Sequence, residues 1–448
     1  TRSRGVEDAD RMPRFPDSVR TAAAVLLAAA TGTALLVEPW ALPVAVVGLG
    51  SWLAITSSGR QALAVTWTGL ATLPRRIGAA SVVVVGIAGV VGVLVALQAM
   101  AEGFRATLNS AGNDQTAIVL RAGANTELSS GLDRTAVRLV TQAPGVLRDA
   151  QDVPVASAEV VVVANVPKRS TGTDANVEIR GVGPGVWALR PEVRIVDGRP
   201  FTPGRRELII GTGALRQFSG LEPGNALQLN NQPWAVVGVF ASGDAHESEI
   251  WGDAESVASA YRRNAFQSVT LRLTGPEALE RFKAALSADP RLRVDAETTR
   301  SYYSKQSEQL TRIIRVLGFG IAVIMAFGAA FGALNTMYAA VAARAREIAT
   351  LRALGFAGLP VVVAVMLETM LLACVGGLIG AAVAWGVFNG YTVSTLGSNF
   401  SQVVFQFRVT PSLLVQGLQW ALVIGFAGGL LPALRAATLP VTAALRES

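Results

Sequence analysis

Cysteine, histidine and charged residues are scarce in this chain, and each scarcity excludes a class of protein. The single cysteine, Cys374, rules out a disulfide framework, so a soluble part must be held together by its own core. The single histidine, His246, excludes a multi-histidine metal site, and no catalytic constellation stands out in the sequence. No Gly-x-x-x-x-Gly-Lys-Ser/Thr loop is present, so the sequence offers no phosphate-binding loop for ATP. We therefore expect no catalytic residue, no resident cofactor and no metal site in this chain.

The low charge content points to a membrane protein. Charged residues make up 16% of the 448 residues and apolar residues 51%, whereas soluble domains carry about 25% charged residues. The formal net charge is +7, but the arginines gather beside apolar runs. That distribution fits membrane orientation better than nucleic-acid binding, so we expect no nucleic-acid partner.

Apolar runs predict about six transmembrane helices. Their expected segments are a hairpin at 21–57 and single spans at 78–102, 312–343, 359–388 and 411–434. Glu38 and Pro39 separate the two arms of the hairpin, which is a turn signal. Each arm is near the lower limit of about 17 residues for crossing a bilayer, so a re-entrant or interfacial pair is the alternative.

Arginine clusters predict the orientation of these spans. They lie in the N-terminal segment 1–20, in an amphipathic surface helix at 58–77, in the connection 344–358 and in the tail 435–448. All four segments fall on one side if the spans alternate, and basic loops favour the cytoplasm. The remaining large segment, 103–311, would then lie outside the cytoplasm.

Segment 103–311 has the pattern of an α+β domain, because short β-branched runs alternate with helical candidates. The expected strands lie at 116–121, 158–166, 176–181, 207–211, 226–229, 234–240 and 267–273, and the expected helices at 132–142, 254–264 and 276–287. The predicted fold class is an α-helical membrane protein, with about six transmembrane helices and an inserted α+β periplasmic domain.

The connection at 344–358 is the main candidate for a functional site. Apolar and charged residues alternate there at helical spacing, which predicts a short amphipathic helix on the cytoplasmic surface, suited to binding a soluble partner. The residues assigned to this contact are Arg344, Arg346, Glu347, Ile348, Leu351, Arg352, Leu354 and Gly355. The alternative is an ordinary basic loop that only sets orientation.

Polar and small residues inside the predicted spans are the next candidates. Glu368 and Asn335 are intramembrane polar residues. For Glu368 we favour pairing with a cytoplasmic-side arginine over proton coupling, because it lies near the membrane interface. Two small-xxx-small patterns predict close helix packing, and they consist of Gly328, Gly332, Gly376 and Gly380.

Three further groups belong to segment 103–311. Asp244, His246, Glu247 and Glu249 form an acidic loop that we interpret as solvated rather than as a cation site, because its ligand spacing is loose. Trp187, Trp234 and Trp251 are expected in the domain core. Tyr302 and Tyr303 are expected in an aromatic belt at the membrane interface.

Several motifs carry a family resemblance. In the membrane part they are Phe331-Gly-Ala-Leu-Asn-Thr-Met337, Arg344 to Gly355, Glu368-Thr-Met-Leu-Leu, Gly376-Gly-Leu-Ile-Gly380 and Gly429-Leu-Leu-Pro-Ala-Leu-Arg435. In the inserted domain they are Ile179-Arg-Gly-Val-Gly-Pro184, Asp197-Gly-Arg-Pro-Phe201, Glu207 to Gly211 and Gln232 to Phe240. Over residues 60–448 the chain resembles the FtsX-like permeases. This is the type VII class of ABC transporters, which includes macrolide-exporter and lipoprotein-releasing permeases.

The resemblance implies a bacterial inner-membrane permease subunit without its own nucleotide site. A dimeric ABC ATPase subunit would dock on 344–355 and bind ATP and Mg. A second permease copy or half would complete the transporter, with membrane lipid around it and a periplasmic adaptor, substrate-binding protein or hydrolase as a further partner. ATP hydrolysis would move the periplasmic domain by mechanotransmission, for export or release of a substrate.

Two alternatives stay open within this resemblance. The first is a non-transporting FtsX-type regulator that activates a cell-wall hydrolase or a sensor partner. The second concerns the extra hairpin at 21–57, which resembles the middle pair of spans in ten-span members. The chain would then be either the C-terminal half of such a protein or a six-span permease.

Overall fold

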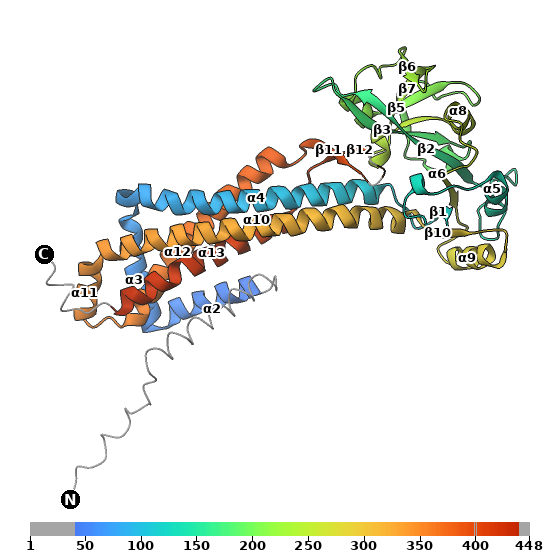
Figure 1. Ribbon diagram of the computed structural model, residues 1–448. Helices are drawn as coiled ribbons and strands as arrows, with labels where there is room; N and C mark the ends of the chain where they lie inside the picture. The colour runs from blue at the N-terminus through green and yellow to red at the C-terminus, as the bar shows by residue number, and fades with distance from the viewer. Residues whose placement is uncertain (1–40, 398, 400, 439–448) are drawn as a thin grey trace, which may run out of the picture. The chain divides into compact units, whose positions relative to one another are not determined.

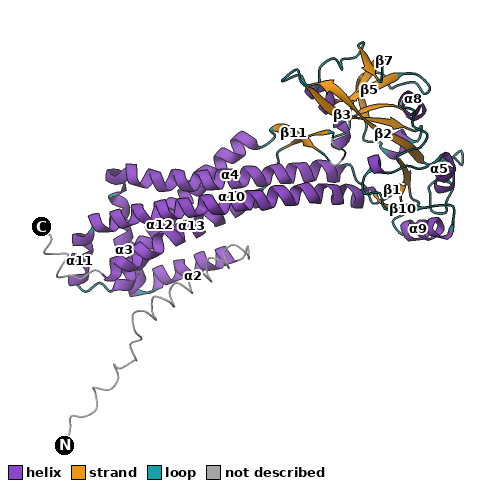
Figure 2. Ribbon diagram, in the orientation of Figure 1, coloured by secondary structure: helices purple, strands orange, loops and turns teal. Residues whose placement is uncertain are grey.

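The computed structural model describes residues 41–397, 399 and 401–438, and these divide into two compact units (Figure 1). Among the described residues, the helical unit contains 41–98, 316–388 and 409–438, and the outer unit contains 99–315 and the described part of 389–408. Every strand that the structure describes belongs to the outer unit (Figure 2). Helices α4 and α10 each run from one unit into the other.

The described part of the helical unit is built from four long apolar helices and four shorter helical elements. Its elements are α2 (Ala41–Ile55), α3 (Ser57–Ala71), the 3₁₀ helix η1 (Leu73–Arg76), α4 (Ile77–Ser110), α10 (Thr299–Ala343), α11 (Ala345–Ala353), α12 (Gly358–Phe388) and α13 (Pro411–Thr438). Among the described residues, α4, α10, α12 and α13 are long and apolar enough to cross a membrane. The first arm of the predicted hairpin, 21–37, lies outside the described residues.

Local sequence explains where the short elements begin and end. The Thr56 hydroxyl accepts the Gly59 N–H and caps the N-terminus of α3. Gly355 adopts a φ of +99° just after α11, a conformation that glycine takes at little cost. Its N–H donates to the Arg352 carbonyl, and the Phe356 N–H donates to the Leu351 carbonyl, which together form a Schellman motif. Gly355 therefore terminates α11 before α12 begins.

Glycines bring α12 close to α4, as predicted for Gly376 and Gly380. A Cβ at Gly376 would lie 2.7 Å from the Val84 carbonyl oxygen, and one at Gly380 would lie 2.4 Å from the Ala88 carbonyl oxygen. An added Cβ at Gly328 or Gly332 would meet no atom of the described residues within 4 Å, so close helix packing at these two glycines stays a prediction. Helix α10 instead presents Ala330 and Ala333 to Gly428 of α13.

The outer unit contains a mixed sheet with the strand order β10-β1-β9-β2-β3-β8-β5-β7-β4, and β6 pairs with β7. The strands are β1 (Thr116–Arg121), β2 (Ala156–Pro167), β3 (Asp174–Val182), β4 (Arg194–Gly198), β5 (Glu207–Gly211), β6 (Ala226–Leu229), β7 (Gln232–Ala241), β8 (Ile250–Asp253), β9 (Ser268–Arg272) and β10 (Val294–Thr298). Each predicted strand is found. Strands β4, β8 and β10 were not predicted.

Short helices and one hairpin complete the outer unit. The helices are η2 (Glu127–Ser129), α5 (Arg134–Thr141), α6 (Val186–Leu189), α7 (Thr212–Gln217), η3 (Ala245–Ser248), α8 (Ala254–Ala260) and α9 (Ala278–Ala288). Strands β11 (Thr392–Leu396) and β12 (Gln402–Gln406) form an antiparallel hairpin in the connection between α12 and α13. The sequence analysis did not predict this hairpin.

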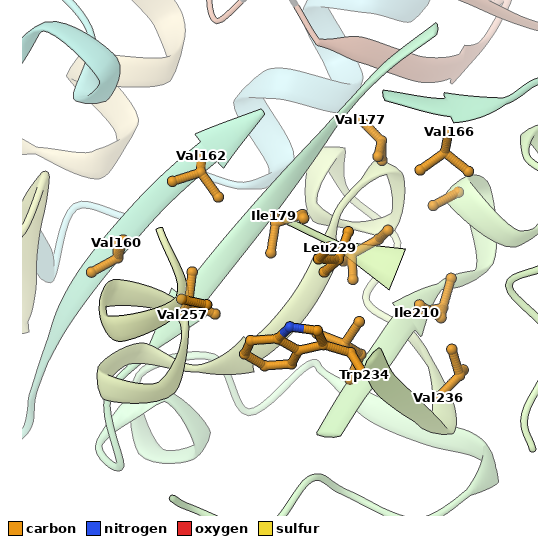
Figure 3. Close-up of a cluster of buried hydrophobic side chains, with 14 of the residues drawn as sticks. Val160, Val162, Val166, Val177, Ile179, Ile210, Leu229, Trp234, Val236 and Val257 are labelled. Atoms are coloured by element: carbon orange, nitrogen blue, oxygen red, sulfur yellow. The ribbon is translucent and has the colours of Figure 1, made fainter. Parts of the chain in front are cut away.

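The core of the outer unit confirms two of the three tryptophan predictions. Trp234 lies among apolar side chains of β2, β3, β5, β7 and α8 (Figure 3), and Trp251 is also fully buried. Trp187 is 38% exposed and packs on the Phe201 ring at a centroid distance of 6.1 Å, so its assignment to the core is wrong.

The prediction of a membrane-interface belt at Tyr302 and Tyr303 is wrong. Both side chains are buried in the outer unit, in an apolar cluster with Phe104, Ile118 and Phe405. The Tyr302 hydroxyl oxygen accepts the Glu127 N–H at 3.2 Å. These tyrosines follow directly after β10 at the start of α10, so they pack against the sheet domain.

Candidate functional site

Helix α11 carries the residues that were predicted to bind a soluble partner. Ile348 is buried against Met337, Val341 and Val361. Leu351 is half-buried, whereas Leu354 is 74% exposed. The apolar stripe therefore begins inside the helical unit and ends on its surface. Arg346 and Glu347 are also exposed on this helix.

An ion cluster fixes the start of α11 to two other elements. Glu368 of α12 accepts a hydrogen bond from Arg344 Nη1 at 3.1 Å and from Arg76 Nη2 at 3.3 Å. Its side chain is 5% exposed. Arg344 also pairs with Glu347 at 3.2 Å. The arginine pairing favoured for Glu368 is therefore present in the structure.

The same cluster explains a glycine in α3. A Cβ at Gly69 would lie 2.9 Å from both Arg344 Nη1 and Glu368 Oε2, so a larger residue would push the pair apart. Beside it, α3, α11 and α12 border an open pocket of about 310 Å³, lined by residues that include Val65, Ile348 and Leu351. Asn335, the other predicted intramembrane polar residue, is exposed on α10 and is not part of the cluster.

The outer unit contains a second charged constellation, which the sequence analysis missed. Arg180 of β3 lies at its centre and donates to four carboxylates within the sheet domain. Its contacts are with Glu127 at 2.8 and 3.0 Å, Glu159 at 2.8 Å, Glu178 at 2.7 Å and Glu249 at 2.8 and 3.0 Å. Arg190 forms two further hydrogen bonds to Glu159, at 2.9 and 3.2 Å. We call these six residues the charge network.

The charge network also corrects the prediction of a solvated loop at 244–249. His246 is buried, with Nδ1 at 2.8 Å from Asp244 Oδ2 and Nε2 at 3.1 Å from the Tyr303 hydroxyl. Glu249 is buried against Arg180 and accepts the Trp251 indole N–H at 2.7 Å. Of the four loop residues, only Glu247 is not buried.

Ion pairing sets the protonation of these buried groups. Burial opposes ionisation of Glu159, but the charges of Arg190 and Arg180 lower its pKa to about 2. Burial likewise opposes ionisation of Asp244, and the His246 charge and hydrogen bonds outweigh it and lower its pKa to about 2. Within the described residues, no group of three or more His, Cys, Asp or Glu is placed to hold a metal ion.

Two family descriptions match separate parts of the chain. The MacB-like periplasmic core domain matches residues 77–289, and the FtsX-like permease C-terminal region matches residues 319–441. The first match spans α4 and most of the sheet domain. The second covers most of α10 and all of α11, α12 and α13.

Curated relatives include two ABC transporter permeases of Bacillus subtilis. YknZ is 26% identical over 293 residues, covering 61% of this chain and 70% of the relative. YvrN is 24% identical over 396 residues, covering 81% of this chain and 93% of the relative. The macrolide export ATP-binding/permease protein MacB of Campylobacter fetus is 24% identical over 280 residues, which cover 57% of this chain and 41% of MacB.

Solved structures of outer domains also align. The periplasmic region of MacB from Actinobacillus actinomycetemcomitans aligns over 44% of this chain and 94% of that chain, with 11% identity and a TM-score of 0.33. The extracellular domain of YknZ from Gram-positive bacteria aligns over 41% of this chain and 98% of that chain, with 16% identity and a TM-score of 0.30.

The long apolar helices and the inserted sheet domain define a class: a multi-pass inner-membrane protein with a periplasmic α+β domain. The chain belongs to the FtsX-like, type VII family of ABC transporter permeases, and within it to the MacB/FtsX type. The predicted family and fold class are thereby confirmed. The family implies an ABC ATPase as a partner in general.

Proposed function

We propose that this permease couples ATP hydrolysis by a separate ABC ATPase subunit to movement of its outer domain. The observation that carries the proposal is the geometry of α11. Its first turn is fixed through Arg344 to Glu368 and Arg76, while Leu354 and Glu347 are exposed for a partner. A helix anchored on one side and exposed on the other can receive force without unfolding.

Continuous helices provide a route for that force. Helix α10 runs for 45 residues from the residue before Arg344 back to the sheet domain, and α4 runs for 34 residues. In the outer unit, the Asn113 N–H that follows α4 donates to Thr299 Oγ1 at the start of α10, at 2.8 Å. Strands β1 and β10, which adjoin these helix ends, pair with each other. A displacement of either helix end therefore acts on neighbouring strands.

The chemistry of ATP belongs to the partner in this proposal. This chain supplies the docking helix, and the ATPase dimer binds ATP and Mg. A second permease copy or half completes the transporter. The substrate is exported or released from the inner membrane or periplasm, in keeping with the macrolide export role in the name of MacB.

Co-purification of the ATPase tests the proposal. We expect Glu347→Arg or Leu354→Asp to abolish co-purification and permease-stimulated ATPase activity, because both side chains lie on the exposed side of α11. Arg344 is a poor choice for this test, since it also holds Glu368. Arg60→Glu, an exposed charge reversal on α3, is the matched control and should leave both readouts unchanged. Wild-type co-purification in the two α11 variants contradicts the proposal.

A further inference from the structure

Strand β9 presents different chemistry to the two faces of the sheet. Val269 and Leu271 lie in an apolar cluster with side chains of α5 and α9. Side chains alternate along a strand, so Ser268, Thr270 and Arg272 lie on the opposite face. Thr270 and Arg272 are two residues apart and are therefore neighbours on that face.

A pocket of about 130 Å³ in the outer unit is lined by both Thr270 and Arg272. Its other walls come from the end of α4 and the turn after it, from the loop after α6 and from the start of α10, and they include Ser110, Arg190, Glu192 and Thr299. Pockets for drug-sized ligands begin at about 300 Å³, so this pocket suits a smaller molecule.

Thr270 supplies this pocket with a buried hydroxyl group that is available to a ligand. The residue is 3% exposed, and its Oγ1 has no hydrogen-bond partner among the described residues. The other hydroxyl groups of the pocket wall have partners within the protein, and they belong to Ser110, Thr116, Thr299 and Tyr303. Buried polar atoms are normally hydrogen-bonded, so Thr270 Oγ1 is the hydroxyl group best suited to contact a bound molecule.

Arg272 supplies the pocket with a positive charge. Its side chain is half-buried, forms no ion pair with a described residue and donates one long hydrogen bond, at 3.5 Å, to Gln115 Oε1. Arg190 is buried, and its charge is already compensated by Glu159 through Nη1 and Nη2. A guanidinium has five N–H donors, so both arginines retain donors for a ligand, but Arg272 provides the uncompensated charge.

We propose that this pocket binds a small carboxylate, whose oxygens accept hydrogen bonds from the Arg272 guanidinium and from Thr270 Oγ1. A guanidinium matches a carboxylate in both charge and geometry, and such charged hydrogen bonds are stronger than neutral ones. The partly buried position of Arg272 excludes some of the water that would otherwise screen the interaction. The ligand would also satisfy the buried Thr270 hydroxyl.

Glu192 limits the charge of the ligand. It lines the same pocket, is exposed and forms no ion pair with a described residue. Its carboxylate repels a multiply charged anion such as phosphate more strongly than it repels a monocarboxylate. The pocket should therefore prefer a ligand with a single negative charge.

The pocket adjoins the place where α4 ends and α10 begins in the outer unit. Asn113 and Thr299, which are hydrogen-bonded to each other at 2.8 Å, both lie in its wall. A ligand that binds the folded pocket stabilises this junction by mass action. Any effect of the ligand on coupling rests on the proposed function, whereas binding of the ligand does not depend on the ATPase.

Ligand-observed NMR titration of the full-length permease with sodium acetate and sodium lactate tests the proposal, at an ionic strength kept constant with sodium chloride. We expect Arg272→Met to weaken binding of both carboxylates by about tenfold or more, because a charged donor is lost. Thr270→Val keeps the shape of the side chain and should weaken binding by about threefold to tenfold. Arg121→Met, an exposed arginine at the end of β1 that does not line the pocket, is the matched control and should bind like the wild type.

Sodium phosphate, followed by its phosphorus signal, tests the selectivity of the pocket. It should bind the wild type more weakly than acetate does, and Glu192→Gln should reduce that difference because the repelling carboxylate is removed. Three outcomes overturn the proposal: no carboxylate binding by the wild type, wild-type binding by Arg272→Met, or tighter binding of phosphate than of acetate.

The test does not depend on a single variant or on the ATPase. If Thr270→Val does not fold, Arg272→Met carries the test, because its side chain is only half-buried. A permease that binds its ATPase normally but does not bind acetate or lactate refutes the carboxylate pocket alone. Normal ATPase binding by the α11 variants, together with normal carboxylate binding, refutes the coupling proposal alone.

Discussion

Two ion clusters of different composition lie in the two units of this permease. In the helical unit, two guanidiniums, Arg76 and Arg344, share the buried Glu368, and Arg344 also pairs with the exposed Glu347. In the outer unit, four carboxylates share Arg180 and Arg190. Arginine does not lose its proton in proteins, whereas a buried carboxylate readily gains one. The first cluster pairs equal numbers of positive and negative groups and suits a permanent anchor, whereas the second buries two more carboxylates than guanidiniums.

Removal of the central arginine should have the largest effect. Arg180→Met leaves four buried carboxylates with only Arg190 as a partner, and breaking a buried pair in this way costs about 3–5 kcal/mol. Thermal or denaturant unfolding of the purified permease, followed by a signal from the sheet domain, measures this loss. Arg134→Met removes an exposed pair with Glu255 and should cost less than about 1 kcal/mol. Similar losses of unfolding free energy in the two variants would show that the buried pairs of the charge network stabilise the protein no more than a surface pair does.

Acid should weaken the outer unit through Glu159. Its pKa is lowered from 4.5 to about 2, so its contribution to stability is complete above pH 4.5 and is lost as the pH falls towards 2. A shift of this size corresponds to about 3 kcal/mol. Unfolding measured at pH 5 and pH 2.5 should show this loss, and Arg190→Gln should reduce the difference. If Arg190→Gln lost as much stability between pH 5 and pH 2.5 as the wild type, protonation of Glu159 would not be the source of the acid sensitivity.

The two ion clusters show which features could be predicted from the sequence and which could not. Periodicity predicted the long helices and α11, because burial in a helix follows a local pattern. Pairing of Glu368 with a cytoplasmic-side arginine was favoured over proton coupling because this acid lies near the membrane interface in the sequence. The charge network was missed because Glu127 of η2 and Glu249, the residue before β8, meet Arg180 of β3 only through tertiary contacts between distant parts of the sequence. No local pattern distinguishes them from surface residues.

Residues with similar sequence contexts had different outcomes for the same reason. The glycine pairs 328/332 and 376/380 have the same spacing, yet only the second meets another helix among the described residues. Tyr302 and Tyr303 border an apolar span, yet they pack inside the outer unit. The hairpin at 392–406 is short and polar, so its strands gave little signal. In each case the partner that decides the outcome is distant in the sequence.

The smallest expected effect is at the anchor. Glu368→Gln leaves Arg76 and Arg344 facing each other, but both side chains retain some exposure, at 21% and 13%. We therefore expect a loss of about 1–2 kcal/mol in unfolding experiments, below the range for a fully buried pair. Glu347→Gln, which alters only the exposed partner of Arg344, is the matched control and should cost less than about 1 kcal/mol. A loss in Glu368→Gln no larger than the loss in Glu347→Gln would show that Glu368 does not anchor Arg76 and Arg344.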